Sequence, residues 1–126
     1  MGEFNLDDFT SLEELVARAR NIIWDSMPCA REALSALEEK SREDEVNISL
    51  YGYILEVLTE VLDPAVENGM WDVVKAFYEL CEALLGLDSS MLEETIEDLV
   101  VKDLAGYRPE LMRWAGPRLR NMVEAY

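Results

Sequence analysis

Apolar residues recur every three or four positions along most of this chain, which is the spacing of helices with one buried face. The pattern is clearest in two segments of residues 51–85, and we predict that they form a helical hairpin at the centre of the fold. Both segments carry further apolar residues off the main stripe, which is typical of helices covered on more than one side. The stripes are Tyr51, Ile54, Leu55, Leu58, Val61 and Leu62, then Met70, Val73, Val74, Phe77, Leu80, Cys81 and Leu84.

The turn of this hairpin should lie in residues 63–69. Pro64 is expected to break the first helix, because a proline cannot continue the backbone hydrogen bonds, and it could start one extra turn. Asn68 and Gly69 then supply the left-handed conformation that closes such a turn. Gly86 is expected to end the second helix.

Two helices should precede the hairpin. The first is predicted to begin at Thr10 or Ser11, because Ser11 and Glu14 have the spacing of a capping box. This start leaves residues 1–9 as an N-terminal arm or a cloning remnant. Asp25 or Ser26 should cap the second helix, since Pro28 is tolerated only in a first helical turn.

The remaining segments are also helical in pattern. A fifth helix is expected from Ser90, which has capping-box spacing to Glu93, and residues 107–126 should form short helices opened by Pro109 and Pro117. No segment shows the alternation of a strand. We therefore predict an all-α, single-domain bundle of about six to seven helices over residues 1–126.

The charge restricts the partners. The 126 residues include 27 acidic and 11 basic ones, for a net charge of −16, and no histidine. Such a chain repels nucleic acid and anionic membranes and favours a basic protein partner. No apolar run could span a bilayer and no secretory leader is present, so we expect a cytoplasmic protein. Cys29 and Cys81 fit no metal or redox spacing and are expected to be buried free thiols.

Catalysis has little support in this composition. Without histidine, neither serine nor cysteine has its usual proton acceptor, and the chain has no glycine-rich phosphate loop. We therefore expect a protein that is not an enzyme and needs no cofactor.

One enzymatic alternative rests on paired carboxylates. Glu79 with Glu82, and Glu94 with Glu97, could together hold Mg²⁺ through oxygen ligands. This arrangement resembles the E-x-x-E plus E-x-x-D pattern of all-α nucleoside triphosphate pyrophosphohydrolases. It departs from that pattern at Glu97, where the family has aspartate, and has only two nearby lysines for phosphate, Lys75 and Lys102.

The fifth helix and the large aromatics offer candidate contacts for a partner. On the fifth helix, Glu93 with Glu97 and Glu94 with Asp98 are like charges one turn apart, and only Lys102 offsets them. This acidic face is either a solubilising surface or a docking site for a cationic patch. Trp71 and Trp114 are either core residues or partly exposed interface anchors. The candidate partner-binding residues are Glu93, Glu94, Glu97, Asp98 and Trp71.

Residues 51–104 resemble small bacterial all-helical, HEAT-like domains. The shared pattern is an apolar helix, a turn with Asn-Gly, a helix F-Y-x-L-C-E-A-L-L and a helix E-E-T-I-E-D-L. Similar segments occur in domains proposed as immunity proteins of bacterial toxin systems, so the resemblance implies a short helical array that masks a toxin domain, such as a cationic nuclease. It carries over no functional residues. A helical adaptor that binds a peptide in an interhelical groove is the third alternative.

Overall fold

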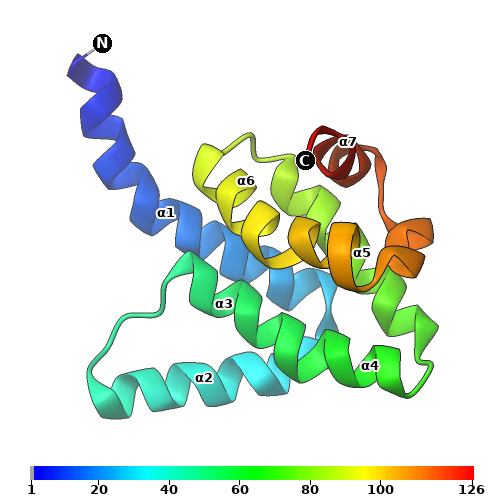
Figure 1. Cartoon of the computed structure of the whole chain (residues 1–126). Helices are drawn as coiled ribbons and strands as arrows, with labels where there is room; N and C mark the ends of the chain where they lie inside the picture. The colour runs from blue at the N-terminus through cyan, green and yellow to red at the C-terminus, as the bar shows by residue number, and fades with distance from the viewer. Residues whose placement is uncertain (1) are drawn as a thin grey trace.

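The computed structural model describes the backbone of residues 2–126 and the side chains of residues 12–126. This part of the chain is helical and contains no strand, which confirms the predicted all-α class (Figure 1). None of its helices combines the length and the apolarity needed to cross a membrane. The elements are α1 (Gly2–Ser26), the 3-10 turn η1 (Pro28–Ala30), α2 (Arg31–Asp44), α3 (Leu50–Val57), the π-helical turn η2 (Leu58–Leu62), α4 (Asp63–Glu67), α5 (Trp71–Leu85), α6 (Ser90–Ile96), the π-helical turns η3 (Glu97–Val101) and η4 (Asp103–Tyr107), the 3-10 helix η5 (Pro109–Trp114) and α7 (Pro117–Ala125).

Helix α5 is the centre of the structure. It packs against α1, α4, α6 and α7, so it is covered from several directions. Apolar residues off its main stripe are buried as well, as the sequence predicted for a central helix. Its buried residues are Val74, Phe77, Tyr78, Leu80, Cys81, Leu84 and Leu85.

The first helix of the hairpin does not break at Pro64 as predicted, although the extra turn that the sequence allowed for is present as α4. Elements α3, η2 and α4 form one continuous helical path (Figure 1), and Pro64 lies in the first turn of α4. The turn before it is widened to the π type, with the Asp63 N–H bonded to the Leu58 carbonyl. A proline ring collides with the carbonyl four residues earlier in a regular helix, and the wider turn accommodates it.

The widened turn also changes which side chains face the core. Tyr51 and Leu55 were predicted to be in the buried stripe, but they are 42% and 37% exposed. Tyr53, Val57 and Ala65 are buried instead. One additional residue in a turn rotates the helix faces that precede and follow it, so a regular 3.6-residue pattern misassigns them.

The turn into α5 has the predicted conformation. Gly69 has a φ of 66°, in the left-handed region that glycine adopts without strain. The Asn68 side-chain amide donates to the Pro64 carbonyl over 2.8 Å, and the Met70 N–H donates to the Ala65 carbonyl over 2.8 Å. These bonds satisfy carbonyls that the end of α4 would otherwise leave free.

Two predictions about the first two helices are wrong. Helix α1 begins at Gly2 rather than at Thr10 or Ser11, because no proline or internal glycine interrupts residues 3–26. It runs to Ser26, so Asp25 and Ser26 belong to α1 and do not cap the next helix.

Helix α6 begins at Ser90 as predicted, but its capping residue is Ser89 and not Ser90. The Ser89 hydroxyl accepts the Leu92 N–H over 3.4 Å. Pro28, Pro109 and Pro117 do open helical segments as predicted.

The two cysteines differ in environment. Cys81 lies in the α5 core, where burial raises the pKa of its thiol well above the ordinary range. Cys29 was also predicted to be buried, but it is exposed. It lies in the short turn η1, where only Ala30 is directed into the core.

Tyr78 is a fully buried phenol on α5. Its ring meets Phe77 edge-on, with centroids 5.2 Å apart, and burial raises the pKa of its hydroxyl. That hydroxyl has no hydrogen-bond partner within the described part of the chain. Tyr53 provides a contrast, because its hydroxyl donates to Glu38 Oε2 over 2.6 Å.

We expect Tyr78→Phe to leave the free energy of unfolding unchanged or to raise it by up to about 1 kcal/mol, because it removes a buried polar atom without a partner. The matched variant Tyr53→Phe should lower it by about 1–2 kcal/mol, because it leaves Glu38 with one donor fewer. Urea denaturation of both variants checks this. An equal loss in the two would mean that the Tyr78 hydroxyl is bonded.

Candidate protein-binding site

An acidic hollow of about 320 Å³ lies between α6 and α7. Glu93, Glu94 and Glu97 line it, and all three are exposed. The side of α7 contributes Met122 and Tyr126, and no basic side chain lines the hollow. Three carboxylates therefore meet solvent beside a partly apolar wall.

The local sequence dictates this arrangement. Leu92, Ile96 and Val100 are buried and hold α6 and η3 against the core. Because they recur every four residues, positions 93, 94 and 97 are directed outward. The Ser89 cap sets the first turn, where the helix dipole favours the carboxylate of Glu93.

Asp98, predicted as part of the same acidic cluster, lies apart from this hollow. It forms an ion pair with Lys102 over 2.7 Å, and this hydrogen bond lowers the pKa of Asp98. Together with Asp63 and Tyr107 it lines a different hollow of about 480 Å³, between α4 and η4. The structure therefore brings together three of the four predicted acidic residues.

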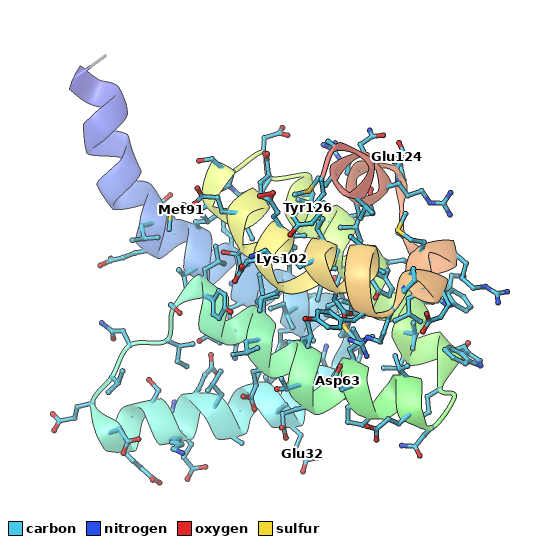
Figure 2. All side chains as sticks on the ribbon, in the orientation of Figure 1. Glu32, Asp63, Met91, Lys102, Glu124 and Tyr126 are labelled. Atoms are coloured by element: carbon cyan, nitrogen blue, oxygen red, sulfur yellow. The ribbon has the colours of Figure 1, made fainter. Side chains whose placement is uncertain are left out.

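The second hollow contains an ion-pair cluster that the sequence did not indicate. Arg108 Nη2 lies 3.0 Å from Asp63 Oδ1 and 2.8 Å from Asp103 Oδ2, and so links α4 to η4. Figure 2 labels Asp63 and Lys102 on the two sides of this region. No helix spacing relates these residues, so no pattern in the sequence could have paired them.

Trp71 is partly exposed, at 47%, but it does not border the acidic hollow. Its ring stacks on that of Trp114, with centroids 6.1 Å apart and 12° between the planes. Trp71 begins α5, whereas α6 begins just beyond the other end of α5, so this pair lies at the opposite end of the domain (Figure 1). The tryptophans form a separate aromatic patch.

The alternative metal site is not assembled. Within residues 12–126, no group of three or more Asp, Glu, Cys or His could hold a metal ion, so Glu79, Glu82, Glu94 and Glu97 do not converge. Glu82 instead caps α7 from α5, accepting the Arg118 N–H over 3.1 Å and the Leu119 N–H over 2.9 Å.

This cap explains Gly116, which occupies the capping position of α7 without a side chain of its own. A Cβ there would lie 2.4 Å from the Glu82 side chain. Glu82 therefore satisfies the first N–H groups of α7, which every helix start leaves without intrahelical partners. Its carboxylate has a structural role that sequence spacing alone could not indicate.

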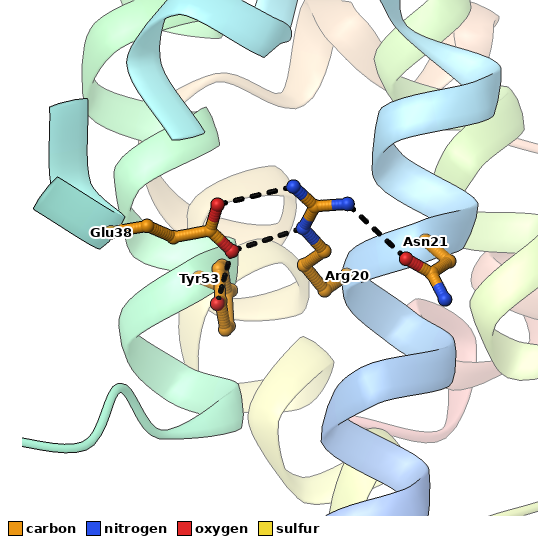
Figure 3. Close-up of polar contacts among 4 residues, drawn as sticks. All are labelled: Arg20, Asn21, Glu38 and Tyr53. Atoms are coloured by element: carbon orange, nitrogen blue, oxygen red, sulfur yellow. Dashed lines mark hydrogen bonds and ion pairs between the residues drawn. The ribbon is translucent and has the colours of Figure 1, made fainter. Parts of the chain in front are cut away.

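Arg20, Glu38 and Tyr53 connect α1, α2 and α3 (Figure 3). Arg20 donates to both carboxylate oxygens of Glu38, over 3.0 and 3.1 Å, and to Asn21 Oδ1 over 3.2 Å. The bonds that Glu38 accepts from Arg20 and Tyr53 lower the pKa of Glu38, whereas burial beside the carboxylate raises the pKa of Tyr53 to about 12. The network fixes the relative positions of three helices.

Comparison of this chain with protein-family models, with curated proteins and with solved structures gives no match.

The Arg20–Glu38 pair should make stability depend on acid pH. The pKa of Glu38 lies below its ordinary value of 4.5. The carboxylate therefore contributes fully to the free energy of unfolding above pH 4.5, and this contribution is lost as the pH falls through the folded-state pKa. We expect Glu38→Gln to cost about 1–2 kcal/mol at neutral pH and progressively less below about pH 4.

The matched control is Glu39→Gln, at an exposed neighbour on the same helix. It should change the free energy of unfolding by less than about 0.5 kcal/mol at either pH. Chemical denaturation across this pH range measures both. A cost for Glu38→Gln that is independent of pH would contradict the ion pair.

Proposed function

We propose that this chain is a non-enzymatic binding protein that docks on a cationic surface of another protein. The observation that supports this most directly is the acidic hollow. Glu93, Glu94 and Glu97 gather around it and form no ion pair within residues 12–126. Arg118 shares a neighbouring hollow with Glu93, but its ion pair, over 3.7 Å, is with Asp88.

Repulsion between these carboxylates slightly destabilises the free protein, and a cationic partner would relieve it. Glu93 and Glu97 are like charges one helical turn apart, which costs a few tenths of a kcal/mol. Lysine or arginine side chains of a partner would neutralise them, and Tyr126 and Met122 would contact the aliphatic stems of those side chains. The net charge of −16 would also accelerate the encounter with a basic protein.

The specific form of the proposal is an immunity-type inhibitor that masks a bacterial toxin domain. It draws on the HEAT-like pattern of residues 51–104 and on the excess of acidic residues. A nuclease toxin has a basic cleft for its anionic substrate, and an acidic helix face could occupy that cleft. The inhibitor itself would need no catalytic residue, which agrees with a chain that lacks histidine.

Affinity capture from the source organism's lysate tests the proposal. Immobilised protein should retain a basic protein at about 50 mM salt and release it at about 500 mM, because such interactions are screened. The double variant Glu93→Lys, Glu97→Lys should reduce retention about ten-fold or more.

The matched control is Glu32→Lys with Glu110→Lys, which makes the same change of charge at exposed positions on α2 and η5. This control should retain clearly more of the basic protein than the α6 variant does. Equal retention by the two double variants, or retention that is insensitive to salt, would contradict a role for the acidic hollow.

A further inference from the structure

A third hollow, of about 890 Å³, lies between residues 12–16 of α1, the end of α2, the start of α3 and helix α6. We call it the α1–α6 groove. It opens on the side of α6 where Met91 lies, whereas Tyr126 and the acidic hollow lie on the side of α7 (Figure 2).

Large apolar side chains on three different helices lie exposed along this groove. Leu12 of α1, Tyr51 of α3 and Met91 of α6 are 41%, 42% and 45% exposed. The half-buried side chains Val16 and Ile48 extend the apolar surface between them. Leu12 belongs to the predicted apolar stripe of α1, whereas Tyr51 lies beside the buried face of α3, and the packing within residues 12–126 leaves both exposed. The groove thus has the composition of a helix-packing surface whose partner helix is missing.

Polar contacts connect the helices that form this groove. Glu38 and Tyr53 line it, and their hydrogen bonds with each other and with Arg20 tie α1, α2 and α3 together. The extended segment beside it is fixed where Ser49 caps α3 by accepting the Gly52 N–H over 3.0 Å. Fixed walls lower the entropic cost of binding, because little of the surface has to be ordered on contact.

Charge decides which occupant suits this surface. Glu13, Glu38 and Arg42 are the charged residues that line it, and the helix segments that contain them, residues 12–16 and 38–45, carry seven acidic residues against Lys40 and Arg42. A second copy of the chain would bring another charge of −16, and anionic lipid or nucleic acid would likewise be repelled. An apolar segment flanked by lysine or arginine is complementary to both features. The acidic residues are Glu13, Glu14, Glu38, Glu39, Glu43, Asp44 and Glu45.

We propose that the α1–α6 groove is a docking site for a basic amphipathic helix of a partner protein. The helix would insert apolar residues, spaced three and four apart, among Leu12, Tyr51 and Met91, in the helix-in-groove mode. Its basic face would lie against the acidic ends of α1 and α2. This proposal does not depend on the acidic hollow between α6 and α7, because different residues form the two surfaces.

The test uses a synthetic peptide as the probe. It consists of leucine and lysine in an amphipathic helical order, about four turns long, and is titrated into ¹⁵N-labelled protein. A scrambled peptide of the same composition has the same charge but cannot form an apolar face. The ordered peptide should shift the amide signals of residues around Leu12, Tyr51 and Met91 and bind about ten-fold tighter than the scrambled one.

Two methionine variants locate the contact. Met91→Lys places a charge on the groove and should weaken binding of the ordered peptide about ten-fold or more. Met70→Lys is the matched control, because Met70 is 52% exposed and lies just before α5, outside the groove. Met70→Lys should leave the affinity for the ordered peptide within about two-fold of that of the unsubstituted protein. Because both side chains are exposed, both variants should unfold at denaturant concentrations close to that of the parent.

Three results would overturn the proposal. One is equal binding of the ordered and scrambled peptides, which would reduce the interaction to charge alone. Another is an equal loss of affinity in the Met91 and Met70 variants. The third is a dimer, seen in sedimentation equilibrium, that Met91→Lys dissociates and Met70→Lys does not, because a second copy would then fill the groove.

Discussion

The burial of α5 is the constraint on which the other elements depend. Its apolar residues face α1, α4, α6 and α7, and each large side chain that leaves water contributes about 1.5–3 kcal/mol. Polar contacts then orient the neighbours: Glu82 of α5 caps α7, and Arg108 ties η4 to α4. Burial thus supplies the stabilisation, and a few specific hydrogen bonds select the arrangement.

This architecture leaves α6 between two different surfaces. Leu92 and Ile96 secure it to the core, so its remaining positions are divided between its two flanks. Glu93 and Glu97 face the hollow beside α7, whereas Met91 and Thr95 line the α1–α6 groove. One helix therefore has a mainly acidic surface on one side and a mainly apolar one on the other. A binding protein can use such a division to gain both association rate and specificity.

Local features of the fold could be predicted from the sequence. The all-α class, the turn at Gly69 and the helix starts at Pro109 and Pro117 depend on short-range backbone preferences. The π-helical turn η2 could not be predicted from the regular 3.6-residue pattern. Its additional residue accommodates Pro64 and shifts Tyr51 out of the core. The site shows the same limit: spacing indicated the outward carboxylates of α6, but only tertiary packing separates Asp98 from them and assigns Glu82 to α7.

Hydrogen exchange of this protein, alone and bound to the basic protein that the affinity capture is expected to retain, tests the central claim most directly. If the acidic hollow is the docking surface, amides of residues 90–97 and of α7 should exchange more slowly in the complex, while those near the Trp71–Trp114 pair should be unchanged. Unchanged exchange in residues 90–97, with protection confined to the tryptophan end, would contradict the account.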